Sequence, residues 1–119
     1  MYNIKIEDSF SSAHNLRGYK GKCEELHGHN WKVEVAVASK KLDKIGMVMD
    51  FKILKAKLSC ILERLDHKYL NRIENFKKIN PTSENIAKYI FDQLKPKIKG
   101  LKSVTVWESE NSSATYYGD

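Results

Sequence analysis

The chain has little of what marks a disulfide-rich or membrane-spanning protein. Cysteine and proline each occur twice and glycine six times among 119 residues. Two cysteines form at most one disulfide, so a scaffold of several disulfides is excluded. No apolar run is long enough to cross a bilayer, and Tyr2–Ile6 lacks the apolar core of a signal peptide. We therefore expect a cytoplasmic globular protein with no membrane partner, its cysteines as thiols, and residues 1–119 as a single domain.

Positive charge is in excess. Lysine and arginine together number 21 against 15 acidic residues, which gives a formal net charge of +6. The lysines are dispersed, as on a solvated surface, and no familiar nucleic-acid-binding motif is present, so we expect no nucleic-acid partner. Arg17, Lys20 and Lys22 lie together just before Cys23, where they could attract a phosphate-rich ligand.

The pattern of apolar residues predicts four strands and two helices. Strands are expected over residues 2–7, 31–38, 104–107 and 114–117. Asp50 is a suitable N-cap for a first helix and Thr82 for a second. The order strand, strand, helix, helix, strand, strand predicts an α+β fold, in which two helices cover one face of a mostly antiparallel four-stranded sheet. An exposed edge of such a sheet invites pairing with another subunit.

Three local expectations accompany this pattern. The segment from Ser9 to Lys22 contains Asn15, Gly18 and Gly21, so it is expected to form a loop around His14. The first helix is expected to stop near Asp66. Cys60 falls among the apolar positions of that helix, and we expect its thiol to be packed in the core.

Three of the four histidines, His14, His27 and His29, lie within sixteen residues. If the second strand begins early, the imidazoles of His27 and His29 project from one face of the sheet. Three imidazoles without a fourth protein ligand are typical of catalytic zinc sites, which keep a position for water or substrate, whereas structural sites are closed by four ligands. Copper, nickel and iron also accept imidazole. The cluster therefore predicts a metal site with an open position.

Several further residues have both a structural and a functional interpretation. Cys23 could be a fourth metal ligand, a nucleophile, a base for proton transfer or an inert thiol. Asp66 and His67 could be polar residues at a helix end or a proton relay to Cys23. Glu108 ends a strand, where it could reach water or accept paired hydrogen bonds from a heterocycle. Thr82 and Glu84 are most simply helix-capping residues.

Six short stretches follow one another in the order of a known family. They are FSSAH at 10–14, CEELHGH at 23–29, DF at 50–51, LDHKYLN at 65–71, NPTSEN at 80–85 and VWE at 106–108. Over nearly its whole length the chain resembles the 6-pyruvoyl-tetrahydropterin synthase and 6-carboxy-tetrahydropterin synthase family. The resemblance implies a tunnelling (T-fold) architecture, in which trimers close their sheets into a barrel, two trimers stack as a homohexamer, and active sites lie between subunits.

The resemblance also implies roles for the candidate residues. By role, they are the Zn²⁺ ligands His14, His27 and His29, the proton-abstracting base Cys23, the relay residues Asp66 and His67, the pterin anchor and relay residue Glu108, and Thr82 and Glu84 near the pterin pocket. Zn²⁺ would be the cofactor, and no organic cofactor is implied. The family's substrate is 7,8-dihydroneopterin triphosphate, so the resemblance implies a zinc-dependent carbon–oxygen lyase.

The spacing of the motif distinguishes two branches of the family. Three residues separate Cys23 from His27, as in the carboxy branch, whereas the pyruvoyl branch typically has five. The carboxy branch forms 6-carboxy-5,6,7,8-tetrahydropterin, acetaldehyde and triphosphate, and its product feeds queuosine and other deazapurine pathways. The chain departs from the family at Ser12, where a small apolar residue is common. The pyruvoyl synthase is the nearest alternative, and a non-catalytic zinc-stabilised binding module is an alternative of a different class.

Overall fold

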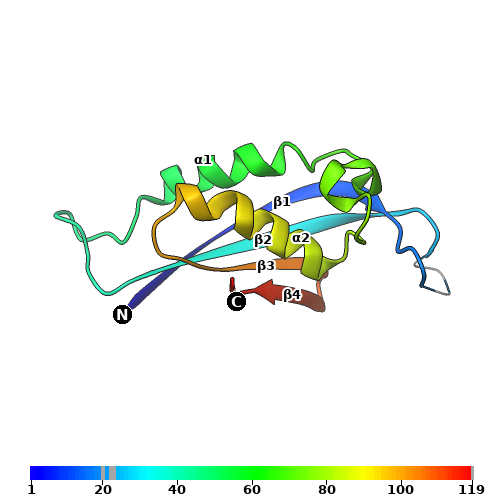
Figure 1. The fold of residues 1–119 in the computed structure, drawn as a ribbon. Coiled ribbons are helices and arrows are strands. Elements are labelled where there is room, and N and C mark those ends of the chain that lie inside the picture. Colours follow the sequence, from blue (N-terminus) through cyan, green and yellow to red (C-terminus); the bar gives the residue numbers. More distant parts are fainter. Residues whose placement is uncertain (20, 22–23, 119) are drawn as a thin grey trace.

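The computed structural model describes residues 1–19, 21 and 24–118 and shows two helices packed on one face of a four-stranded antiparallel sheet (Figure 1). The elements are β1 Tyr2–His14, β2 His27–Ser39, α1 Phe51–Leu62, α2 Ser83–Leu94, β3 Leu101–Ser109 and β4 Ser112–Tyr116, with short 3₁₀ helices at Leu70–Arg72, Glu74–Phe76 and Lys95–Lys97. The strands lie in the order β1-β2-β3-β4. The predicted α+β class and its layers are confirmed.

The hairpin of β1 and β2 is the longest feature of the sheet. Its register runs without interruption from Tyr2 opposite Ser39 to His14 opposite His27. The expectation of a loop from Ser9 onward is therefore wrong, because β1 continues to His14. Small polar residues such as Ser11 carry a weak strand signal by themselves, and pairing with the strongly β-forming β2 outweighs that signal.

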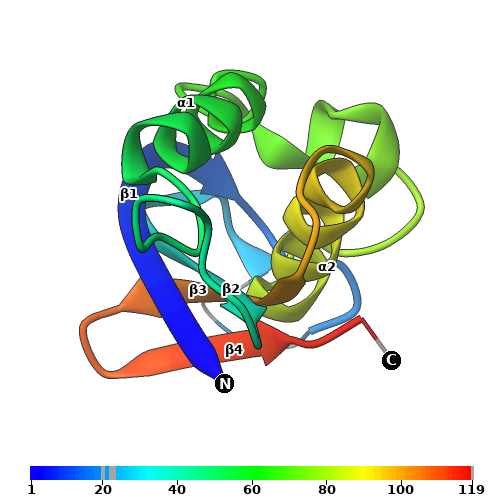
Figure 2. The same ribbon diagram turned by 90° about the vertical axis from the view of Figure 1, so that its left-hand side faces the viewer.

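The core lies between the sheet and the helices, which cover the same face of the sheet in two perpendicular views (Figures 1 and 2). The buried residues of α2 recur at helical spacing and form one apolar face, namely Ile86, Ala87, Ile90, Phe91 and Leu94. In α1, Asp50 is the N-cap and its side chain accepts a hydrogen bond from the Lys52 N–H. The helix ends at Leu62 and turns follow from Glu63 on, so it ends earlier than expected.

The expectation for Cys60 is wrong, because its side chain is exposed. The inner face of α1 is set by Leu54, Leu58 and Ile61, all fully buried. Cys60 follows Leu58 by two residues, which is about 200° around a helix, so it lies on the opposite side. Its thiol is accessible and distant in sequence from the histidine motif.

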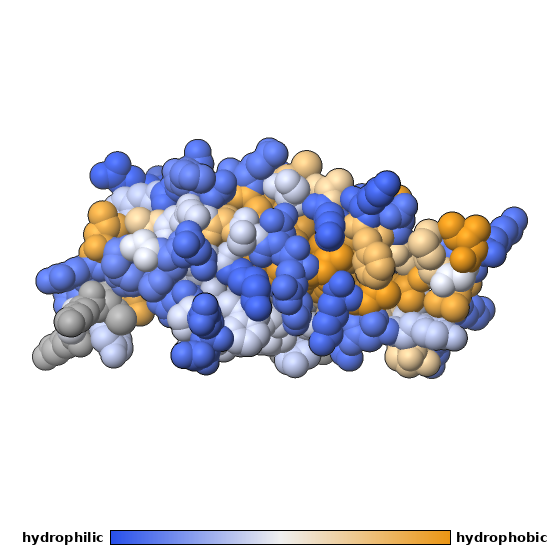
Figure 3. Space-filling model, turned by 180° about the vertical axis from the view of Figure 1, so that it is seen from behind, coloured by the Kyte–Doolittle hydropathy of each residue, from blue (hydrophilic) through white to orange (hydrophobic). Residues whose placement is uncertain are grey.

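β1 and β4 form the two edges of the sheet. Figure 3 shows the reverse side of the molecule as largely hydrophilic, with hydrophobic residues gathered toward the end that carries the β2–α1 connection. A pocket at that end is lined by Tyr2, Ile4, Leu42, Val48 and Phe51, among others. Tyr2, Leu42 and Phe51 are exposed there, and a contiguous patch of exposed apolar side chains is typical of an interaction surface. No helix in the described part of the chain is long and apolar enough to span a membrane.

Candidate metal centre

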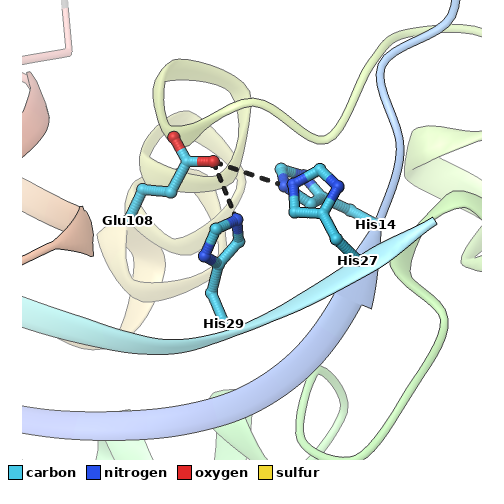
Figure 4. A group of neighbouring side chains, drawn as sticks. All are labelled: His14, His27, His29 and Glu108. Atoms are coloured by element: carbon cyan, nitrogen blue, oxygen red, sulfur yellow. Dashed lines mark ion pairs between the residues drawn. The ribbon is translucent and has the colours of Figure 1, made fainter. Parts of the chain in front are cut away.

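Three imidazoles and one carboxylate converge at the end of the sheet where β1 stops and β2 starts (Figure 4). His14 is the last residue of β1, and His27 and His29 are the first and third residues of β2. Glu108 reaches the same point from the end of β3. Because side chains alternate along a strand, His27 and His29 share the face that also buries Trp31. The early start of β2 that places both imidazoles on one side is thus confirmed.

Main-chain carbonyls fix the orientation of two rings. His14 Nδ1 lies 2.8 Å from the Pro81 carbonyl oxygen, and His27 Nδ1 lies 2.8 Å from the Glu25 carbonyl oxygen. A ring that donates from Nδ1 presents an unprotonated Nε2, which is the tautomer that binds a metal. The donors offered by His14, His27, His29 and Glu108 lie within 4.8 Å of one another.

The surroundings favour the neutral forms of His14 and His29. Burial lowers the pKa of His14 below its ordinary value, and the nearby His27 lowers it further. Burial also lowers the pKa of His29, although Glu108 opposes the shift. Within the described part of the chain, the buried Nε2 atoms of His14 and His29 have no hydrogen-bond partner. A buried polar atom without a partner is costly, and a neutral imidazole is a metal ligand, so the cluster fits a bound cation.

Glu108 supplies a possible fourth donor that the sequence analysis assigned to pterin instead. Its Oε1 lies 2.9 Å from His29 Nε2 and 3.5 Å from His14 Nε2, without the geometry of a hydrogen bond. Ligand atoms of a tetrahedral zinc site with bonds of about 2.0–2.1 Å are roughly 3.3 Å apart. The carboxylate of Glu108 therefore lies where a fourth metal ligand could bind. The sequence had predicted that this fourth position would be free of protein donors.

Trp31 is a residue of this site that sequence analysis missed. Its ring packs edge-on against His14 and His29, with centroids 4.8 and 5.1 Å apart, and its Nε1 donates to the Ser12 carbonyl oxygen at 3.1 Å. It limits how both rings can turn. The signal was available, because Trp31 follows His29 by two positions on the same strand and so shares its face.

Asp66 and His67 lie in a turn against the outer edge of β1. Asp66 Oδ1 accepts from the Ser11 main-chain N–H at 2.9 Å and lies 3.0 Å from His67 Nδ1. The bond from Ser11, then that from His67, lowers the pKa of Asp66. His67 has a φ of 56°, a backbone conformation that is uncommon outside glycine and often marks a functional position. Among the described residues, no hydrogen bond or ion pair joins this pair to the histidine cluster.

Of the remaining candidate residues, Thr82 and Arg17 make structural hydrogen bonds and Glu84 is exposed to solvent. Thr82 caps α2 by accepting from the Asn85 N–H at 3.1 Å, and Glu84 is exposed in its first turn. The guanidinium of Arg17 donates to three main-chain carbonyls, those of Asn71, Phe76 and Ile79. Its hydrogen-bond donors therefore stabilise the local fold and are not all available to a phosphate group.

Cys23, Lys20 and Lys22 lie outside the described residues. Their predicted roles, the thiol base and two cations near a phosphate-rich ligand, therefore rest on the sequence.

Comparison with known proteins gives consistent results. Residues 3–119 match the family model described as 6-pyruvoyl tetrahydropterin synthase. The chain is 44% identical to a 6-carboxy-5,6,7,8-tetrahydropterin synthase of Synechocystis sp., over 98% of this chain and 94% of the relative. It is 37% identical to a 6-pyruvoyl tetrahydrobiopterin synthase of Dictyostelium discoideum, over 92% and 91%. The solved 6-pyruvoyl tetrahydropterin synthase of Caenorhabditis elegans superposes with a TM-score of 0.91 at 34% identity, covering 99% of this chain and 96% of that one.

Proposed function

The chain belongs to the 6-pyruvoyl tetrahydropterin synthase family, and from that premise we propose that it is a zinc-dependent 6-carboxy-5,6,7,8-tetrahydropterin synthase. It is a carbon–oxygen lyase that converts 7,8-dihydroneopterin triphosphate to 6-carboxytetrahydropterin, acetaldehyde and triphosphate, a step of queuosine and deazapurine biosynthesis. The observation that carries the proposal is the convergence of His14, His27 and His29. Main-chain carbonyls hold Nδ1 of His14 and His27, and the buried Nε2 atoms of His14 and His29 have no hydrogen-bond partner among the described residues.

Two observations favour the carboxy product. The relative of Synechocystis carries the carboxy name at 44% identity. The three-residue spacing between Cys23 and His27 is also that of the carboxy branch. The pyruvoyl synthase remains the second candidate, because the relative from Dictyostelium and the solved structure from Caenorhabditis carry pyruvoyl names.

The metal site is proposed to hold Zn²⁺ through His14, His27 and His29. Nitrogen donors suit zinc, and the neutral forms of His14 and His29, which burial favours, need no proton loss before binding. When bound, zinc supplies Lewis acidity that polarises oxygens of the substrate side chain. The protein's contribution is to hold the rings in place, which the Pro81 and Glu25 carbonyls do from behind His14 and His27.

Glu108 is proposed to leave the imidazoles when pterin binds. Its side chain is 35% exposed, so it can turn toward a ligand. A carboxylate accepts two parallel hydrogen bonds from the amino-amide edge of a pterin ring. By exchanging its contacts with His14 and His29 for those donors, Glu108 would open one side of the cluster to the substrate side chain. This reconciles the anchor role with the observed position of the carboxylate.

Cys23 is proposed to take the proton from substrate, with Asp66 and His67 as its relay. The His67 side chain is 82% exposed and, within the described residues, is not a member of the histidine cluster. A second copy could bring this turn to a cluster of its partner. We therefore propose a homohexamer with intersubunit active sites, supported by the edge strands β1 and β4 and the exposed apolar end of the sheet. Thr82 and Glu84 are proposed to lie near the pterin.

Product analysis tests the proposed function. Zinc-loaded protein incubated with 7,8-dihydroneopterin triphosphate is expected to release acetaldehyde and 6-carboxytetrahydropterin in equal amounts, as measured by mass spectrometry. Triphosphate release with 6-pyruvoyl-tetrahydropterin and no acetaldehyde would support the second candidate instead. Zinc binding without consumption of substrate would contradict both and leave the zinc-stabilised binding module.

A further inference from the structure

Ser12 lies at the junction between the histidine cluster and the turn that carries Asp66 and His67. It is the last core-facing residue of β1 before His14, and it pairs with His29 across the hairpin. The residue is buried, with 7% of its surface exposed. Ser11, one position earlier, faces the opposite side of the sheet, where its hydroxyl donates to Asn30 Oδ1 at 2.6 Å.

The hydroxyl of Ser12 spans the turn from both sides. Its Oγ donates to the Leu65 carbonyl oxygen and accepts from the Lys68 N–H at 3.0 Å. Asp66 and His67 are the two residues between these contacts. The single hydroxyl therefore binds the main-chain carbonyl just before the Asp66–His67 pair and the main-chain N–H just after it.

The main chain of β1 also binds the Asp66–His67 turn. The His67 N–H donates to the Ser11 carbonyl at 2.6 Å, and the Ala13 N–H donates to the Lys68 carbonyl at 3.0 Å. These bonds hold the backbone of the turn along the edge of β1. The N–H of the peptide between His67 and Lys68 is bound instead by Ser12 Oγ. This peptide directly follows His67, the residue with the positive φ.

The carbonyl of Ser12 points to the other part of the site. It accepts the hydrogen bond of Trp31 Nε1, and the Trp31 ring packs against His14 and His29. One residue thus contacts the Asp66–His67 turn through its side chain and the residue that supports the metal-binding rings through its main chain.

We propose that Ser12 is a positioning residue, whose hydroxyl fixes the Asp66–His67 turn relative to the strand that ends in the metal ligand His14. The inference rests on the proposed function, in which Asp66 and His67 act in proton transfer. Loss of the hydroxyl leaves the metal ligands and Trp31 in place, because those contacts use the main chain, but it removes the two side-chain bonds that fix the turn at Leu65 and Lys68. Misplacement of a reacting group by about 1 Å can cost up to about 100-fold in rate.

Three variants test the role: Ser12→Ala, Ser12→Thr, which keeps a hydroxyl, and Ser11→Ala as a matched control on the other face. In Ser12→Ala we expect faster hydrogen exchange at the Lys68 amide, zinc affinity within about 2-fold of wild type, and a kcat lower by about 10-fold with KM nearly unchanged. Ser12→Thr is expected to restore both the slow exchange and kcat. Ser11→Ala is expected to behave as wild type in all three measurements.

Several results would overturn the role. Equal Lys68 exchange in wild type and Ser12→Ala would show that the hydroxyl does not hold the turn, and unchanged kcat despite faster exchange would show that the turn needs no such support. Loss of zinc, or an equal loss of kcat in Ser11→Ala, would indicate a merely structural effect. The exchange measurement needs no substrate, so a wild-type protein that turns nothing over contradicts the proposed function separately.

Discussion

Replacing His27 with alanine is expected to weaken zinc binding by more than about 100-fold and to abolish turnover. Loss of a residue that merely orients a zinc ligand typically costs 10–100-fold in affinity, and loss of a ligand itself should cost more. The His27 ring faces His14 at 4.5 Å between centroids and is held from behind by the Glu25 carbonyl. Zinc content after purification and a competition titration with a chelator measure the effect.

His67→Ala is the matched control, because it removes a histidine that lies outside the cluster. It is expected to keep its zinc and to lose activity through the relay. If His27→Ala retained a full equivalent of zinc with unchanged affinity, His27 would not be a ligand. If His67→Ala lost the metal as well, the division between ligands and relay would be wrong.

Replacing Cys23 with alanine is expected to leave zinc bound and to lower kcat by about 100- to 10,000-fold, the usual contribution of a positioned acid–base group. The expectation follows from the proposed division of labour, in which the imidazoles hold the metal and the thiol moves a proton. Zinc content and steady-state kinetics are measured on the same preparation.

Cys60→Ala provides the control for thiol loss. Cys60 is exposed on the outer side of α1, whose inner face is buried without it. This variant should keep both zinc and full activity. A Cys23→Ala protein that loses its metal would identify Cys23 as a ligand, and one that keeps wild-type kcat would remove it from the proton transfer.

Local patterns predicted the parts of the site that lie within one element. Side chains alternate along β2, so His27 and His29 lie on the same face of the strand as Trp31. The convergence of the two histidines therefore followed from their spacing. The cap of α2 at Thr82 likewise depends on its immediate neighbours. The pairing of β1 with β2 was not local, and for that reason His14 was assigned to a loop although it lies in a strand.

Contacts between distant segments could not be deduced from the sequence. The approach of Glu108 to His29 depends on the path of β3, and the Pro81 carbonyl reaches His14 across 67 positions of sequence. Ser12 carried a signal in its departure from the family's small apolar residue, but its partners at Leu65 and Lys68 appear only after folding. The exposure of Cys60 depends on which side of α1 meets the sheet, which apolar spacing near a helix end defines poorly.

X-ray absorption spectroscopy of the zinc-loaded protein tests the central claim, that imidazoles hold the metal and leave one position for substrate. The expected spectrum contains only nitrogen and oxygen neighbours at about 2.0–2.1 Å, including three imidazoles, and changes when a pterin is added. A sulfur neighbour at about 2.3 Å that persists with pterin present would contradict the claim, because Cys23 would then close the site.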